Sequence, residues 1–292
     1  MSEPIEEGET AEAVASAEPK PDESAPVAPR KKAKKKGPPA PSADVPAPIP
    51  FAASPLALAA RPAYALALLS GFLYFLAFPG IDVWPLSFVA LVPLIVALRG
   101  QTAKRALGLG WLAGFTMTML GFYWLLPMLK LFSGFPTVLC VFFMAILCAY
   151  QAGRIALCGW LYGRAERRGW PAAPAFALAF VASELAFPLL FPWYYAATVH
   201  NAPVFVQLAD LGGPYLVALV LAAVNLALAE LIFVFVRKEP RPLDRRVLAA
   251  GAGALATSLL YGAVRIHQVD AAAAVATPVK IGIVQGNLPL MA

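Results

Sequence analysis

Glu184 is the residue whose type and position most strongly suggest chemistry. It lies in an apolar run over residues 172–190, about twelve residues past the start of the run. At 1.5 Å per residue that is roughly 18 Å along a helix. An acid at such a depth in a bilayer costs about 3 kcal/mol and is a functional candidate by default. A carboxyl group that only holds helices together fits equally well, so the sequence leaves both interpretations open.

Trp193 belongs to an aromatic and polar stretch that follows Glu184. Phe191, Pro192 and Trp193 come first, and tyrosines, a histidine and an asparagine follow without any cation up to residue 201. Tryptophan is enriched where a membrane meets water. We therefore expect a loop at one membrane surface that either receives a lipid head group or only marks the interface.

Asp82 and Trp84 stand in a second loop candidate, FPGIDVWP at residues 78–85. Two prolines and a glycine predict a tight reversal between helices, with Trp84 as an interfacial anchor. The functional alternative is a loop that supports an external domain or lines an entry path for lipid.

Trp124 ends a third candidate stretch, GWLAGFTMTMLGFYW at residues 110–124. Gly110 and Gly114 have the GxxxG spacing that lets two membrane helices approach closely. Close helix packing is the simpler interpretation of the glycines, whereas the aromatic end of the stretch could face acyl chains.

Other reactive residues are sparse. Cys140, Cys148 and Cys158 share one apolar run, which argues against a disulfide framework. His200 and His267 lie far apart without a ligand spacing, so we expect no metal site and no cofactor.

Composition indicates which elements must position these residues. Of 292 residues, 60% are hydrophobic and 14% charged, which is typical of an integral membrane protein. Only helices fit, because an open sheet edge cannot be satisfied in lipid. We therefore expect an all-α polytopic membrane protein with seven transmembrane helices. The apolar runs cover residues 62–78, 83–98, 106–129, 137–162, 172–190, 213–236 and 247–263.

The distribution of cations predicts the topology. The formal net charge of +6 would suggest nucleic acid in a soluble protein, but here the cations lie in alternate gaps between apolar runs, and we expect no nucleic-acid partner. With the N-terminus in the cytoplasm, and with Arg154 counted at an inner helix end, only Lys130, Arg265 and Lys280 fall outside. The predicted domains are a disordered cytoplasmic tail over 1–60, the membrane domain over 61–266 and an extracytoplasmic segment over 267–292.

The final segment predicts one β-strand. Val279, Ile281 and Ile283 alternate with Lys280, Gly282 and Val284, and a Gly-Asn turn follows. A single strand cannot bury its apolar face, so we expect it to begin a further domain.

Together these pieces resemble the apolipoprotein N-acyltransferases, which complete lipoprotein maturation in the bacterial inner membrane. The residues that carry the resemblance are FPGIDVWP at 78–85, the stretch from Gly114 to Trp124, Glu184 with the following FPW, and VQGNLP at 284–289. In that family the last element opens a nitrilase-like catalytic domain.

The resemblance implies that an acyl chain passes from a phospholipid, through a cysteine thioester, to the diacylglyceryl-cysteine of an apolipoprotein. The Glu-Lys-Cys triad of the family would lie in a nitrilase-like α/β domain beyond residue 292. We therefore expect no catalytic residue in this chain, no acyl-thioester on its three cysteines, and an inactive chain unless a nitrilase-like chain is supplied separately. Asp82, Trp84, Trp124, Glu184 and Trp193 are the candidates for contact with lipid or substrate.

Two other classes of function stay open. In a secondary transporter Glu184 would be a coupling carboxylate, although such proteins usually show internal repeats and none is evident here. A non-catalytic scaffold would only hold a separately encoded catalytic chain at the membrane surface.

Overall fold

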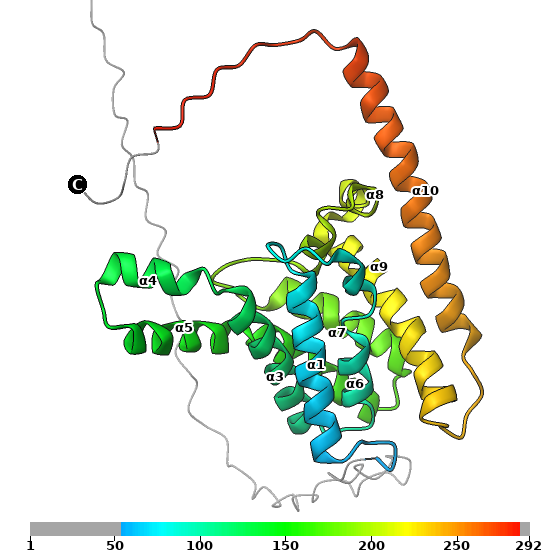
Figure 1. The fold of residues 1–292 in the computed structure, drawn as a ribbon. Coiled ribbons are helices and arrows are strands. Elements are labelled where there is room, and N and C mark those ends of the chain that lie inside the picture. The colour runs from blue at the N-terminus through cyan, green and yellow to red at the C-terminus, as the bar shows by residue number, and fades with distance from the viewer. Residues whose placement is uncertain (1–53, 287–292) are drawn as a thin grey trace, which may run out of the picture. The chain divides into compact units, whose positions relative to one another are not determined.

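The computed structural model describes residues 54–286, which are helical or irregular, with no strand anywhere in that range. Most of the tail expected over residues 1–60 lies outside the described part. Figure 1 shows the helices in chain order. They are α1 Ala60–Ala77, the 3-10 helix η1 Trp84–Phe88, α2 Val92–Leu98, α3 Ala103–Gly121, α4 Leu125–Ser133, α5 Thr137–Gln151, α6 Gly153–Arg167, α7 Ala172–Ala186, the 3-10 helix η2 Tyr195–Val199, α8 Pro203–Val206, α9 Ala209–Leu231, the π-helix η3 Ile232–Val236 and α10 Arg245–Val275.

The chain has several helices suited to a membrane, but the predicted number of seven is not confirmed. Within residues 54–286, four helices are long and apolar enough to cross a bilayer, and a bent pair would make five. Two further apolar segments, Trp84–Leu98 and Ala172–Ala186, are shorter than the ~20 residues that a crossing needs. The four long helices are Ala60–Ala77, Thr137–Arg167, Ala209–Val236 and Arg245–Ala274. The second of them combines α5 and α6, and the third combines α9 and η3.

Proline is the reason why the apolar run over residues 106–129 does not form one straight helix. The run divides into α3 and α4, which are bent by 64°. Pro127 has no N–H for the carbonyl four residues back, so a continuous helix would lose that bond. In the first turn of a new helix the same residue costs little.

Two other runs end or divide at prolines. Pro85 and Pro93 each lie in the first turn of a short helix, η1 and α2. Pro188 disfavours the helical conformation at Phe187, which adopts an extended ψ of 121°. The run over 172–190 therefore becomes the shorter helix α7 and an extended loop. Helix α1 ends in the same way, because Phe78 precedes Pro79 and has an extended ψ of 148°.

The last helix is longer than its apolar run of 247–263. Asp244 caps the start of α10, because its side chain accepts a hydrogen bond of 3.0 Å from the N–H of Arg246. At the other end the alanines at 271–274 favour continued helix, and α10 reaches Val275. Figure 1 shows α10 along α9, and the two helices pack against each other.

Helices α3 and α6 form the most intimate contact in the bundle. A Cβ added at Gly110 would lie 2.3 Å from the carbonyl oxygen of Ile155, and one at Gly159 would lie 2.3 Å from that of Ala106. No side chain fits at either position. The expectation that Gly110 serves close helix packing is confirmed, and this contact fixes α6 in the interior.

The predicted strand is not confirmed in the described residues. Residues 277–286 have no regular structure, and Val279, Ile281 and Ile283 are exposed. A strand is stable only when its backbone groups pair with another strand, and residues 54–286 offer none. The Gly-Asn turn falls partly outside the described range.

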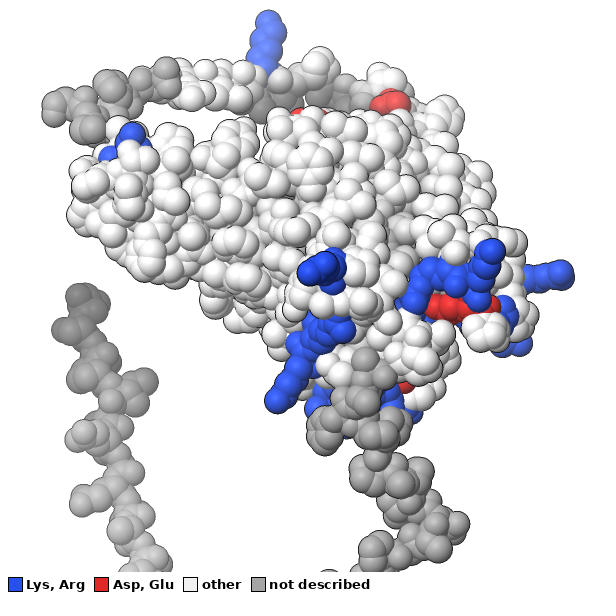
Figure 2. Space-filling model, turned by 60° about the horizontal axis from the view of Figure 1, so that its bottom comes forward, with Lys and Arg blue, Asp and Glu red and all other residues white. Residues whose placement is uncertain are grey.

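Cations gather on one face of the molecule. Figure 2 shows lysine and arginine side chains around a few acidic groups on the face that lies at the bottom of Figure 1. We call this face the cation-rich end. It is formed by the end of α2, the start of α3, the end of α6 with the turn after it, the segment between α9 and α10, and the start of α10. Its cations are Arg99, Lys104, Arg105, Arg164, Arg168, Arg237, Arg241, Arg245 and Arg246.

Candidate functional site

Glu184 forms an ion pair with Arg154 in the interior of the bundle. Nη1 of Arg154, in the first turn of α6, donates to Oε1 of Glu184 near the end of α7. Both side chains have no solvent exposure. The assignment of Arg154 to an inner helix end is therefore wrong: charge in the low dielectric of the core must be compensated, and Glu184 supplies the compensation.

Two tyrosines complete the surroundings of this pair. Nη2 of Arg154 donates to the hydroxyl of Tyr74 in α1, at 3.0 Å. The backbone N–H of Tyr195, at the start of η2, donates to Oε1 of Glu184 at 2.8 Å. The Tyr195 hydroxyl then donates to the carbonyl of Ser87 at 2.6 Å. The pair thus ties α1, α6, α7 and the segment after α7 together.

Trp193 covers the ion pair. The guanidinium carbon of Arg154 lies 4.3 Å from the centroid of the Trp193 ring, a cation–π contact in a site without solvent. Tyr74 and Phe78 pack edge-on against the same indole, each with a centroid distance of 5.3 Å. Glu184 Oε2 and Trp193 Nε1 have no hydrogen-bond partner among the described residues.

The loop over residues 187–194 is fixed by polar contacts as well. Gln151, at the end of α5, accepts from the N–H of Leu190 at 2.9 Å and donates to the carbonyl of Phe191 at 3.0 Å. The hydroxyl of Tyr150 donates to the carbonyl of Pro188. The loop has no regular structure of its own, so these bonds replace the ladder that a helix or strand would supply.

Trp124 is connected to Trp193 through a series of edge-on and tilted ring contacts. The ring of Phe191 lies 5.7 Å from Trp124 and 6.0 Å from Phe122, and Phe122 lies 6.3 Å from Phe78, which contacts Trp193. Trp124 is 39% exposed, so the rings run from the buried pair to the surface. We call these five residues, Phe78, Phe122, Trp124, Phe191 and Trp193, the aromatic cluster.

Asp82 and Trp84 do not belong to this cluster. Asp82 adopts a left-handed φ of 65°, and its carboxylate lies 3.5 Å from Nε2 of His200 at the surface. Trp84 packs against Phe88 and Phe205, with centroid distances of 6.4 and 6.0 Å. The five predicted residues therefore divide into one group of three, Trp124, Glu184 and Trp193, and two separate positions.

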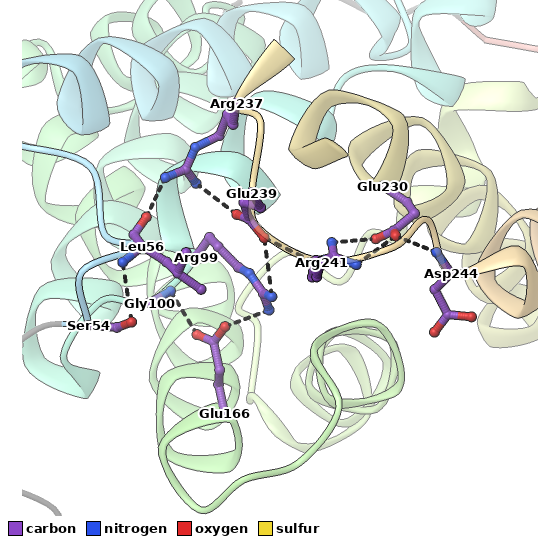
Figure 3. A network of polar contacts seen from close by, with 10 residues as sticks. All are labelled: Ser54, Leu56, Arg99, Gly100, Glu166, Glu230, Arg237, Glu239, Arg241 and Asp244. Carbon is purple, nitrogen blue, oxygen red and sulfur yellow. Dashed lines mark hydrogen bonds and ion pairs between the residues drawn. The ribbon is translucent and has the colours of Figure 1, made fainter. Parts of the chain in front are cut away.

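A second polar network lies at the cation-rich end (Figure 3). Arg241 donates to both carboxylate oxygens of Glu230 at 2.7 Å each and to Glu239 at 3.0 Å. These hydrogen bonds to Glu230 hold the pKa of the Arg241 guanidinium above its ordinary value. The sequence predicts a structural role for Glu230 near an inner helix end. Its contacts are consistent with this role, because they join the end of α9 to the segment before α10.

Arg99 connects this network to α6. Its guanidinium bonds to Glu166 at 2.8 Å and lies 3.5 Å from Glu239. Glu166 also accepts from the N–H of Gly100 at 2.9 Å. Three guanidinium groups surround the buried ring of Phe233, at 5.2 to 5.9 Å from its centroid. They belong to Arg99, Arg237 and Arg241.

The first site is suited to positioning more than to reaction. Arg154 and Glu184 neutralise each other, and their hydrogen bonds fix the loop that carries Phe191 and Trp193. Cys140, Cys148 and Cys158 are free and buried within the helices. This part of the chain therefore presents an aromatic surface whose position is fixed by a desolvated ion pair.

Sequence reasoning missed Arg154 as a member of this site. The available signal was charge: a carboxylate deep in an apolar run calls for a cation at similar depth in another run. Arg154 is the charged residue within the apolar run over 137–162. Tyr74 and Tyr195 carried no comparable signal, because tyrosine is common in membrane helices and at their ends.

Comparison with known proteins places this geometry in a family. Residues 70–227 match the family model described as the apolipoprotein N-acyltransferase N-terminal domain. Among curated proteins, the apolipoprotein N-acyltransferase of Geobacter metallireducens is 28% identical over 229 residues, which cover 77% of this chain and 43% of the relative. Those of Pseudomonas putida and Azotobacter vinelandii are 31% and 32% identical over 78% of this chain, and 45% and 44% of their own lengths. The chain therefore spans less than half the length of these relatives.

Proposed function

The chain belongs to the apolipoprotein N-acyltransferase family, and from that premise we propose that it is the membrane part of an enzyme that acylates lipoproteins. The acyl donor would be a membrane phospholipid and the acceptor the diacylglyceryl-cysteine of an apolipoprotein. The observation that carries the proposal is the matched region itself: residues 70–227 contain both members of the buried ion pair and the loop that it fixes.

The aromatic cluster has a specific task in this proposal. Trp124 lies at the bend between α3 and α4, where its side chain is 39% exposed and would face lipid. An acyl chain that slides along Trp124 and Phe191 meets a surface that does not have to be ordered on binding, because Gln151 already fixes the loop. Such preorganisation lowers the entropic cost of holding a flexible lipid.

We place the chain in the bacterial cytoplasmic membrane with seven crossings, the N-terminus inside and the C-terminus outside. The two shorter apolar segments, Trp84–Leu98 and Ala172–Ala186, would then cross together with the bent pair and the four long helices. The cation-rich end supports this orientation, because lysine and arginine favour the cytoplasmic side. The domain boundaries at 60 and 266 belong to the same proposal.

The segment over residues 279–284 would become a strand once a sheet is available. Its alternating valine and isoleucine side chains are exposed in this structure. Pairing with a nitrilase-like domain, in the same polypeptide or in a separate chain, would bury them and satisfy the backbone.

The structure gives little support to a transporter in which Glu184 carries protons. A coupling carboxylate must release and rebind its proton, whereas Glu184 is held by a guanidinium and a backbone N–H.

A reconstitution experiment tests the proposal. Cells depleted of their own apolipoprotein N-acyltransferase would receive this chain together with the part of the Pseudomonas putida relative that it does not match. Mass spectrometry of a lipoprotein should then detect the N-acylated form. A Trp124→Ala and Trp193→Ala double variant should lower its amount at equal membrane expression.

The matched control replaces this chain with an unrelated membrane anchor. If that anchor supports the same acylation, the chain is only a scaffold and the proposal fails. The topology is tested separately with a cysteine placed after residue 286 and a membrane-impermeant thiol reagent. Labelling of intact spheroplasts is expected, and labelling only after lysis would contradict the orientation.

A further inference from the structure

A groove with a volume of about 430 Å³ lies between α6 and α7, toward the cation-rich end. We propose that it binds one anionic glycerophospholipid, with an acyl chain along α7 and the phosphate at Arg164 and Arg168. This α6–α7 groove is distinct from the aromatic cluster, and the proposal does not depend on acyl transfer.

The wall of the groove on α7 is shaped for a narrow, flexible occupant. Ala175, Ala179 and Ala182 line it and follow one another at intervals of four and three residues, on one face of the helix. Their small side chains leave a trough about 10 Å long at 1.5 Å per residue. Leu161 and Leu178 flank it, so the trough is apolar along its length.

The mouth of the groove carries uncompensated positive charge. Arg164 and Arg168 line it and are exposed, and neither has a carboxylate within ion-pair distance among residues 54–286. Glu166 lies between them in sequence but is engaged by Arg99 at 2.8 Å on another side of α6. Glu166 therefore does not neutralise Arg164 and Arg168. Their free positive charge favours a lipid with a net negative head group over a zwitterionic lipid.

Two tryptophans mark the level of the lipid head groups. The guanidinium of Arg164 lies over the ring of Trp160, 5.0 Å from its centroid, which holds the cation at the mouth. Trp170, in the turn before α7, also lines the groove and is exposed. Indole rings prefer the boundary between acyl chains and water. The arginines, the tryptophans and the apolar trough therefore follow one another as the phosphate, the interface and the acyl chain of a phospholipid do.

A lipid in this groove would act on the buried ion pair through the helices that form it. Arg154 lies on α6 and Glu184 on α7, and the groove between these two helices reaches along α7 to Ala182, two residues before Glu184. Because it contacts both, the bound lipid would stabilise their packing and so the position of the loop over 187–194.

The test measures lipid binding by the purified full chain in detergent. Phosphatidylglycerol is added in mixed micelles, with zwitterionic phosphatidylcholine, which has no net charge, as the comparison, and retained lipid is counted by native mass spectrometry. The test variant is Arg164→Gln with Arg168→Gln. The matched control is Arg245→Gln with Arg246→Gln, which removes two exposed cations at the same end but outside the groove.

We expect phosphatidylglycerol to bind the unchanged chain and the control alike, and to bind the test variant roughly 30-fold more weakly, the effect of two lost surface cations. Ala182→Leu, at an exposed position that lines the trough, should weaken binding while both arginines remain. Equal binding of the two phospholipids would overturn the proposal, and so would equal losses of binding in the test and control variants. The proposal would also fail if inorganic phosphate alone raised the unfolding temperature of the chain as much as phosphatidylglycerol does.

Discussion

Two arginine–glutamate sites lie toward the two ends of α6, and they differ in their access to water. Arg154 and Glu184 form a single pair with no exposure, covered by an indole ring. At the other end Glu166 belongs to a network of several partners, whose side chains are between 2% and 28% exposed. The chemistry of the ions is the same, but their surroundings are not.

The difference shows what each site can tolerate. A charge without solvent has no substitute for its partner, so loss of one member leaves an uncompensated ion. In the network each arginine contacts more than one group, and water can replace what is lost. We therefore expect the first site to specify one packing of the helices and the second to hold loops together with some redundancy.

The largest effect is expected for Glu184→Gln. The amide can still accept from the N–H of Tyr195, but Arg154 is left as a buried cation without a counter-charge. The stability of the detergent-solubilised chain should fall by about 3 to 5 kcal/mol. Thermal unfolding followed by size-exclusion chromatography measures it. Wild-type stability of this variant would contradict a closed, desolvated pair.

The double variant Arg154→Met with Glu184→Leu is the control for that result. Removing both ions avoids the unpaired charge, so the double variant should be more stable than Glu184→Gln alone. If the double variant is worse than the single one, packing and not charge is what Glu184 provides.

The next effect in size concerns the contact that positions α6 and its two sites. Gly110→Ala would place a methyl group 2.3 Å from the carbonyl of Ile155, next to Arg154 in sequence. Overpacking of this kind costs about 1 to 3 kcal/mol. Gly108→Ala is the matched control on the same helix, since no atom lies within 4 Å of its added Cβ. Equal stabilities of the two variants would show that α3 and α6 do not touch as described.

A smaller effect is expected in the network. Arg241→Gln should lower stability by about 1 kcal/mol, because Glu239 keeps Arg99 and Arg237 nearby. The raised pKa of Arg241 means that its contribution is present at every pH below the ordinary arginine range, so the loss should be the same at pH 6 and pH 9. Between 0.1 and 1 M salt it should shrink, whereas the loss in Glu184→Gln should not. Identical salt dependence would remove the contrast between the sites.

The smallest effect is expected for Asp82→Asn. The Asp82 and His200 side chains are 38% and 44% exposed, so their contact should contribute less than about 0.5 kcal/mol. Asparagine also tolerates the left-handed φ of 65°. A loss comparable to that of Glu184→Gln, in the same unfolding assay, would give this surface contact a structural importance that its exposure does not suggest.

Several features followed from the sequence because they depend on local composition. Apolar runs predicted membrane helices, since a lipid environment requires the backbone to bond within its own segment. The motifs at Glu184 and Trp193 indicated the family that the comparisons then showed. The close approach at Gly110 was also predictable, because only small residues allow it.

Other features were decided by tertiary structure. Nothing local distinguishes Arg154 from the cations at helix ends; the packing of α6 against α7 makes it the partner of Glu184. The strand expected over residues 279–284 depends on a neighbour that residues 54–286 do not supply. Sequence by itself determined which segments are apolar and where charge is costly, whereas the fold determined which charges meet, because an ion pair is a contact between residues that are distant in the chain.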